Sequence, residues 1–263
     1  MVVRPRDDSP GACGDGPDPR RARDGEPDSD AFAAADAIAA RVRGAEPEEV
    51  PGRLCEVAVE LLPVTGASVS LRSDGMPVQV SASSERAAHL AQIQATLGDG
   101  PCRSAVEEGA PVLACDLTSP RDAGRWPVFA QQATAAGVRA VYAVPLGSDA
   151  VCVGTLDLYR DSPGALTDRQ LGVARLVAGA MTAELMSLPR GDEAESRGGQ
   201  AWLCGLAVGH DEVHQAVGMI MAQLGVGADD ALARLRGDAF ARGCTVLEVA
   251  HDVITHHRRL ERE

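Results

Sequence analysis

Residues 211–259 read DEVHQAVGMIMAQLGVGADDALARLRGDAFARGCTVLEVAHDVITHHRR, where three helix-period patterns follow one another with little sequence between them. In the first, apolar residues recur at spacings of three and four, which places on one side of a helix Val213, Val217, Ile220 and Leu224. The second pattern repeats this spacing with Ala228, Leu232, Leu235 and Ala239. The third carries Val246, Ala250 and Val253 on one side, with Leu247 and Ile254 beside them. Three short helices can hide such stripes against one another, so we expect a compact helical bundle.

The ends of these helices are also visible in the sequence. Gly225 and Gly243 follow the first two patterns, and glycine takes the left-handed cap conformation at little cost. Asp229 and Asp230 stand in the first turn of the second helix, where the helix dipole favours negative charge. Thr245 and Glu248 have the spacing of a capping box and mark the start of the third helix.

The letters of this segment resemble the ANTAR family. The resemblance rests on QAVGMIM at residues 215–221, on EVA at 248–250, and on Ala231, Leu235, Arg236, Ala239 and Leu247. It implies a three-helix RNA-binding domain of the kind found at the C-terminus of bacterial regulators that act by transcription antitermination. It also implies a homodimer, because members of the family commonly act as dimers.

The charge of the segment restricts where RNA could bind. From residue 200 to residue 263 there are nine acidic residues against six arginines. Since nucleic-acid affinity comes largely from neutralising phosphates, RNA binding must rest on local clusters. The candidates are Gln215, whose amide can hydrogen-bond a base edge, and three arginines that can fork to phosphates or stack on bases, Arg234, Arg236 and Arg242. For each arginine alone, a solvated surface charge is the alternative.

The composition of the whole chain excludes several functions. The 263 residues are 45% hydrophobic and 24% charged, which indicates one or two globular domains. A formal charge of −13 argues against general adhesion to nucleic acids or anionic membranes. All 25 basic residues are arginine. The lack of lysine excludes a P-loop nucleotide site, a pyridoxal Schiff base and a phospho-receiver domain.

Targeting signals and metal sites are not expected. The chain has no apolar run near the ~20 residues of a membrane span and no signal-peptide pattern, so we expect a cytoplasmic protein with no membrane partner. The seven cysteines are scattered and form no CxxC pair, which favours reduced thiols over structural zinc or a disulfide framework. His210 and His214 have a spacing that could hold a metal, but without further ligands we interpret them as solvated.

Sequence patterns in the rest of the chain predict three further parts: a tail, a folded domain and a linker. Residues 1–30 are crowded with proline, glycine, aspartate and arginine and are predicted to be a disordered tail. Residues 31–188 are predicted to form a folded domain, residues 189–204 a linker and residues 205–263 the bundle. Within residues 31–188 we expect helices at 31–43, 47–62 and 85–97, a short helix after Cys102, a helix ending at 137, and a helix from the capping box at Thr167 and Gln170 to 188.

Strands are expected at 67–71, 78–80, 111–116, 139–146 and 151–159, and the first two form a hairpin. In the first strand, apolar residues alternate with Ser68, Ser70 and Arg72, which is typical of a strand with one buried face. RWPVF at 125–129 is expected to be irregular. Strands and helices in this order predict the α+β class: a mixed or antiparallel sheet covered by helices, followed by a small C-terminal three-helix bundle.

Six stretches of this part resemble the GAF domain, in the version that precedes ANTAR domains in actinobacteria. They are LGDGPC at 97–102, PVLACDL at 111–117, RWPVF at 125–129, GVRAVYAVPL at 137–146, VGTLDLY at 153–159 and LTDRQ at 166–170. The resemblance covers roughly residues 48–186 and implies that the domain at residues 31–188 is a GAF-like sensor of small molecules. GAF domains bind cyclic nucleotides, tetrapyrroles, haem or small metabolites, and nothing in this sequence selects a cofactor among them.

The expected ligand pocket contains seven residues: Cys102, Asp116, Arg125, Trp126, Phe129, Asp157 and Tyr159. Cys102 stands at a turn into a helix, where a thiolate is favoured, so it is a candidate redox sensor. The alternative is a buried small hydrophobic residue. Trp126 and Phe129 either cap the pocket or pack in the core. The two aspartates either orient a ligand or flank strands.

Together these features predict a regulator that is not an enzyme. The GAF domain would sense a small molecule, a redox state or a partner, and the bundle would bind paired stem-loops in nascent transcripts. Two alternatives remain. The cysteine content is compatible with a GAF-fold methionine sulfoxide reductase, and the negative charge is compatible with a protein-interaction or dimerisation bundle that does not bind RNA.

Overall fold

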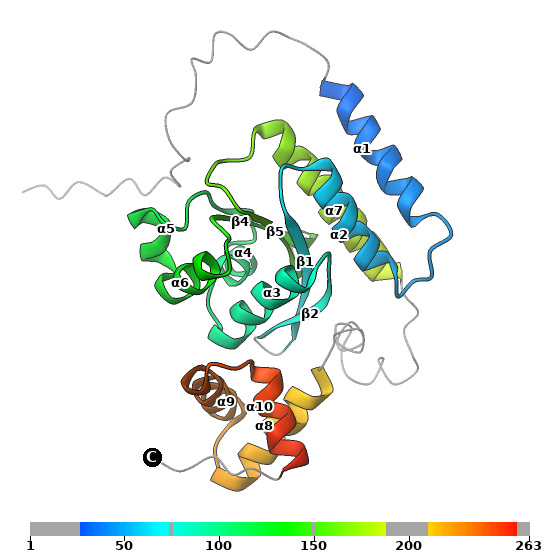
Figure 1. Cartoon of the computed structure of the whole chain (residues 1–263). Coiled ribbons are helices and arrows are strands. Elements are labelled where there is room, and N and C mark those ends of the chain that lie inside the picture. The colour runs from blue at the N-terminus through cyan, green and yellow to red at the C-terminus, as the bar shows by residue number, and fades with distance from the viewer. Residues whose placement is uncertain (1–26, 74–75, 149–150, 188–209, 257–263) are drawn as a thin grey trace, which may run out of the picture.

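A computed structural model describes residues 27–73, 76–148, 151–187 and 210–256, which form an α+β domain followed by a bundle of three helices (Figure 1). This confirms the expected fold class. Most of the predicted tail, residues 1–26, lies outside the described residues, as does the predicted linker at 189–204. The domain boundaries drawn from the sequence therefore stay predictions.

A five-stranded antiparallel sheet forms the centre of the first domain, with strand order β2-β1-β5-β4-β3. The strands are β1 (Gly66–Ser73), β2 (Met76–Ala82), β3 (Val112–Ala114), β4 (Ala140–Ser148) and β5 (Val151–Arg160). β1 and β2 form the expected hairpin. In the middle of the sheet, Ser68 stands opposite Asp157 and Ser70 opposite Thr155.

Two helices, α2 (Val50–Leu61) and α7 (Asp168–Ser187), cover one face of this sheet, and α1 (Pro27–Val42) packs against these two helices (Figure 1). Their core includes the fully buried side chains of Leu54, Leu71, Leu156, Leu158 and Met181. The capping box before α7 is confirmed, because the backbone N–H of Thr167 donates to Gln170 at 2.9 Å and that of Gln170 to the Thr167 hydroxyl at 3.2 Å.

Four helices lie on the opposite face: α3 (Glu85–Leu97), α4 (Pro101–Glu108), α5 (Pro120–Arg125) and α6 (Pro127–Ala135). Their core includes Leu90, Trp126, Phe129, Val141 and Tyr159. The expectation that residues 125–129 are irregular is wrong. α5 ends at Arg125, Trp126 is the cap residue of both helices, and Pro127 starts α6, because proline is well suited to the first turn of a helix.

β1 was expected to have one buried face and one solvent-exposed face, and its exposure differs from this expectation. Ser68 is 0% exposed and Ser70 is 3% exposed, so both faces of this strand are buried at these positions, and Arg72 is exposed as expected. The apolar residues of β1 face the apolar core on one side of the sheet. The serines that alternate with them face a polar cluster under α3 and α4 on the other side.

The C-terminal bundle consists of α8 (His210–Leu224), α9 (Ala228–Arg242) and α10 (Val246–Thr255). Its core contains Val213, Ala216, Ile220, Ala231, Leu235, Ala239, Val249 and Val253. Ala228 is exposed, so Ala231 takes the core position that the sequence pattern gave to Ala228. The capping box of Thr245 and Glu248 is confirmed, and both Gly225 and Gly243 have positive φ angles, of 69° and 64°.

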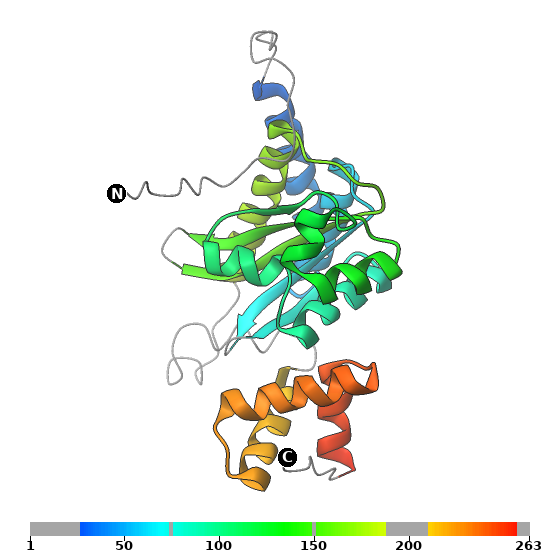
Figure 2. The same ribbon diagram turned by 90° about the vertical axis from the view of Figure 1, so that its left-hand side faces the viewer.

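The bundle lies against β2 and the C-terminal end of α3 in both views (Figures 1 and 2). Val78 of β2 packs into the apolar cluster of the bundle. The backbone N–H of Val246, at the start of α10, donates a buried hydrogen bond of 3.2 Å to the hydroxyl of Thr96 in α3.

Within the described ranges, no single helix is both long and apolar enough to cross a membrane, and only the pair formed by residues 212–224 and α9, bent by 106°, meets that test together.

Candidate functional site

A polar cluster is buried on the face of the sheet that α3 and α4 cover. Successive side chains of a strand point to opposite faces, so the side chains at positions 155, 157 and 159 of β5 share this face. The neighbouring strand adds two hydroxyl groups. The cluster contains Ser68, Ser70, Thr155, Asp157 and Tyr159, all at most 3% exposed.

Gln94 joins this cluster to two helices. From α3, its Nε2 atom donates to Oδ2 of Asp157 at 3.1 Å. Its Oε1 atom accepts from the backbone N–H of Cys102, in the first turn of α4, at 2.9 Å. The residue before α4 must be small, because Gly100 has a φ of 139° and a Cβ there would lie 2.6 Å from Oε1 of Gln94. The GDGPC sequence thus allows Gln94 to reach α4.

Asp157 is the most perturbed carboxyl group of the cluster. Its burial raises the pKa to about 7, although hydrogen bonds from Gln94 and Thr155 favour the charged form. Its second oxygen, Oδ1, is buried and has no hydrogen-bond partner in the part of the chain that the structure describes. A buried carboxyl group with an unused oxygen can change its protonation near neutral pH and can accept a hydrogen bond from a ligand.

Tyr159 and Ser68 complete the cluster, with 2.9 Å between their hydroxyl oxygens. Burial, followed by the charge of Asp157, raises the pKa of the Tyr159 hydroxyl well above its usual value. Tyr159 is therefore a neutral hydrogen-bonding group at physiological pH.

Cys102 stands at the N-terminal turn of α4 but is only 2% exposed. Burial and the charge of Asp157 raise the pKa of its thiol well above the usual value. These effects exceed those of the backbone hydrogen bonds, which lower the pKa. The thiol is therefore protonated at neutral pH, and these surroundings disfavour the thiolate that the sequence suggested.

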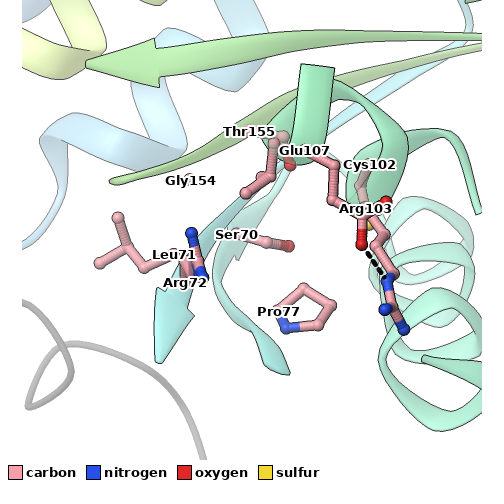
Figure 3. A pocket seen from close by; sticks show the side chains of 10 residues that line it. Ser70, Leu71, Arg72, Pro77, Cys102, Arg103, Glu107, Gly154 and Thr155 are labelled. Carbon is pink, nitrogen blue, oxygen red and sulfur yellow. Dashed lines mark hydrogen bonds and ion pairs between the residues drawn. The ribbon is translucent and has the colours of Figure 1, made fainter. Parts of the chain in front are cut away.

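A cavity of about 150 Å³ opens beside Cys102, between the sheet and α4 (Figure 3). Arg103 on its wall donates to Glu107 at 2.7 Å, and its Nη1 atom donates to the carbonyl of Gly98 at 2.7 Å. The cavity is lined by Ser70, Leu71, Arg72, Pro77, Cys102, Arg103, Val106, Glu107, Gly154 and Thr155. Two cluster residues, Ser70 and Thr155, form part of its wall.

The seven expected pocket residues fall into two groups. Cys102 lines this cavity, and Asp157 and Tyr159 belong to the buried cluster beside it. The other four, Asp116, Arg125, Trp126 and Phe129, lie at or near α5 and α6. Their assignment to a ligand pocket stays a prediction.

Three residues of that second group interact with neighbouring residues of the same domain. The indole N–H of Trp126 donates to the Ser104 hydroxyl at 3.2 Å, and the guanidinium of Arg125 lies 4.3 Å above the indole ring. Asp116 accepts hydrogen bonds from the backbone and the hydroxyl of Thr118, which lower the pKa of its carboxyl group.

The four RNA candidates are spread over the bundle. Gln215 is exposed on α8. Arg234 and Arg236 are two residues apart on α9 and point to nearly opposite sides of it, since each residue turns the helix by about 100°. Arg242 pairs with Asp252 at 2.7 Å and with Asp238 at 3.5 Å. One RNA segment could not contact all four residues in this arrangement.

Sequence reasoning missed Gln94, Ser68, Thr155 and Arg103. Gln94 is a polar residue within the helix pattern at 85–97, but its burial, at 1% exposed, is visible only in the structure. Arg103 gave no signal, because its place on the cavity wall depends on how α4 packs. No group of three histidine, cysteine or acidic side chains that could hold a metal occurs among the residues that the structure describes.

These features define a sensor-type α+β domain, with a small cavity beside a buried polar cluster, that carries a three-helix output module. The chain belongs to the GAF domain family, whose model matches residues 44–185, and an ANTAR domain follows at residues 208–254. ANTAR domains bind RNA and GAF domains bind small-molecule signals. The pair is therefore that of a signal-sensing regulator with an RNA-binding output.

Solved structures with a similar fold have low sequence identity to this chain. A domain of a two-component sensor histidine kinase protein from Sinorhizobium meliloti is 21% identical, with a TM-score of 0.46 over 59% of this chain and 100% of that chain. The GAF domain of a phosphoenolpyruvate-protein phosphotransferase from Coxiella burnetii is 15% identical, with a TM-score of 0.45 over 65% and 97%.

A type II free methionine-R-sulfoxide reductase from Thermoplasma acidophilum is 18% identical, with a TM-score of 0.39 over 59% of this chain and 92% of that chain. No curated protein matches the chain significantly.

Proposed function

We propose that this protein is a cytoplasmic regulator that binds paired RNA stem-loops in nascent transcripts and acts by transcription antitermination. Its GAF domain senses a small molecule, a redox state or a partner, and its ANTAR domain delivers the response. In this proposal the protein acts as a homodimer. Two linked modules bind two stem-loops more tightly than one module binds one stem-loop.

The observation that carries this proposal is the position of β2. Pro77 lines the cavity beside Cys102, and the next residue, Val78, packs into the core of the bundle. A ligand in the cavity therefore contacts a strand that also holds the output domain. A signal can act across such a contact if it binds one arrangement of the two domains more tightly than another.

The reductase alternative has less support. A reductase that used Cys102 as its nucleophile would need the thiolate, and burial beside Asp157 disfavours that form. No described feature of the site favours sulfoxide chemistry over ligand binding.

The test is the affinity of the purified full chain for an RNA with two adjacent stem-loops, measured at two salt concentrations beside a duplex DNA of equal length. We expect selective RNA binding that weakens as salt rises, because phosphate contacts release counterions. In a transcription assay with the same RNA placed before a terminator, the protein should increase read-through. Equal affinity for the DNA, or salt-independent binding, would contradict the proposal.

A further inference from the structure

One face of α9 carries an exposed aromatic residue next to an arginine. Phe240 is 54% exposed and is the one large hydrophobic residue of the described bundle that is more than a third exposed. Arg236 precedes it by four residues, so the two side chains are neighbours on the same face of the helix. Gly237 stands next to Phe240 on the helix surface, and no group outside its chain neighbours and the helix backbone lies within 4 Å of where its Cβ would be, among the residues described. The part of this face around Phe240 is therefore open to a flat ligand, whereas Arg236 lies under the end of α3.

Arg236 has hydrogen-bonding capacity that the rest of the described chain does not use. Its guanidinium lies against Gly98 at the end of α3, where a Cβ on the glycine would come within 2.7 Å of Nη1. Its Nε and Nη2 atoms are buried without a hydrogen-bond partner in the described chain. Burial and then the nearby charge of Arg103 lower its pKa. A buried guanidinium without an anion is unfavourable, so Arg236 should bind a phosphate readily.

We propose that this face of α9 is an RNA-contact site in which Phe240 stacks on an unpaired loop base and Arg236 binds the adjacent phosphate. Every base has a flat face that an aromatic ring can stack on, and single-stranded loops present their bases in this way. A guanidinium binds a phosphate through two parallel hydrogen bonds. The proposal rests on the RNA-binding function proposed above and assigns that function to particular side chains.

The GAF domain covers one half of this site. The end of α3 lies on Arg236 and leaves Phe240 exposed, and it is held there by the bond between Thr96 and Val246 and by Val78 in the bundle core. RNA and α3 therefore compete for Arg236. The complete site forms when α3 moves away, and a phosphate then supplies the partner that Gly98 does not.

The stacking half is tested with Phe240→Leu and Phe240→Tyr in the full chain, with Phe32→Leu as the matched control. Phe32 is also exposed, at 67%, but lies on α1 of the other domain. We expect Phe240→Leu to weaken stem-loop binding roughly tenfold, because it removes one base stack, and Phe240→Tyr to keep the affinity. Ultraviolet cross-linking followed by mass spectrometry should place RNA on the α9 peptide of the unchanged protein.

The covered half is tested with Val78→Asp, which puts a charge into the contact, and with Val128→Asp as the control on an exposed part of α6. Hydrogen exchange around Arg236 reports opening without RNA. We expect Val78→Asp to increase that exchange and to raise RNA affinity on the order of tenfold, since a covered site binds only in its open fraction. Ala95→Arg, at a half-buried position of α3, replaces Val78→Asp if that variant does not fold.

The outcomes separate the proposals. If the unchanged protein binds RNA and Phe240→Leu binds as well as Phe32→Leu, the site on α9 is wrong while the RNA function stands. If Val78→Asp opens the contact without raising RNA affinity, competition for Arg236 is wrong. If Phe240→Leu changes the sedimentation of the protein but not its RNA binding, Phe240 serves a protein contact. If the unchanged protein binds no RNA, both the function and this site are wrong.

Discussion

Gln94 donates a hydrogen bond from Nε2 to Oδ2 of Asp157 at 3.1 Å, and this bond ties α3 to the centre of the sheet. Two and four residues further along, Thr96 and Gly98 contact the bundle. The buried carboxyl group and the output domain are thus connected through five residues of one chain segment. We expect a change in the charge or hydrogen bonding of Asp157 to act on the bundle contact through the end of α3.

Asp157 should make the stability of the protein depend on pH. Its pKa of about 7 in the folded state lies above the ~3.9 of an unfolded aspartate, so the folded protein holds this proton more tightly. The free energy of unfolding is therefore not reduced by Asp157 at low pH. It falls as pH rises through the interval from about 4 to about 7, because the folded protein must then ionise a buried carboxyl group. We expect Asp157→Asn to remove this loss and to be more stable than the unchanged protein at pH 8, by up to about 4 kcal/mol.

Urea unfolding at pH 5, 6, 7 and 8 measures this difference. Asp116→Asn is the control, because hydrogen bonds lower the pKa of that carboxyl group and its stability contribution is lost only in acid. Its difference from the unchanged protein should be flat over this range. A flat difference for Asp157→Asn as well would show that Asp157 stays charged in the folded protein.

Gly100 should not tolerate a side chain. Alanine at this position would strain the backbone at a φ of 139° and would push Oε1 of Gln94 away from the N–H of Cys102. We expect Gly100→Ala to lower the free energy of unfolding by about 2–5 kcal/mol. Gly109→Ala is the control, since Gly109 also has a positive φ but its Cβ would meet no described atom within 4 Å; it should cost about 1–2 kcal/mol. Equal losses would mean that the Gln94 contact adds nothing to stability.

The thiols should react in an order set by burial. Burial raises the pKa of Cys55 to about 12 and that of Cys102 well above its usual value, whereas Cys152 and Cys244 are partly exposed. Because the thiolate is the reactive form, we expect iodoacetamide to modify Cys152 and Cys244 in the folded protein much faster than Cys102. Peptide mass spectrometry over a time course gives the rates. Modification of Cys102 as fast as Cys152 would restore Cys102 as a candidate redox sensor.

Local patterns in the sequence predicted most of the fold. The helix from 85 to 97, the hairpin of β1 and β2 and both capping boxes depend on neighbours within a few residues, and these are visible in the sequence. Burial by distant segments is not visible. Ser68 and Ser70 looked solvent-facing because the position of α3 over them depends on the packing of the whole domain.

The candidate site could be predicted only in part for the same reason. Cys102, Asp157 and Tyr159 stood out as unusual residues in motifs. Gln94 connects Cys102 with Asp157 by hydrogen bonds. These three positions are far apart in the sequence, and helix or strand periodicity cannot predict that they meet. For the bundle, the sequence identified Arg236 as an RNA candidate, but its contact with Gly98 arises between two domains and leaves no mark in the local pattern.

Replacing Arg236 by methionine should separate stability from RNA binding. The guanidinium has two buried nitrogen atoms without partners in the described chain, so an apolar side chain of similar length should leave the free energy of unfolding unchanged or raise it by about 1 kcal/mol. The same change should weaken RNA binding and reduce the slope of log affinity against log salt by about 1, because one phosphate contact is lost.

Arg242→Met is the comparison, because Arg242 pairs with Asp252 and Asp238 and lies away from the face of α9 that carries Phe240. It should lower the thermal midpoint slightly by breaking these pairs. If Arg236→Met lowers the thermal midpoint as much as Arg242→Met does, Arg236 has a stabilising partner in the folded protein. The competition between RNA and the end of α3 would then lose its physical basis, because Arg236 would gain nothing by exchanging α3 for a phosphate.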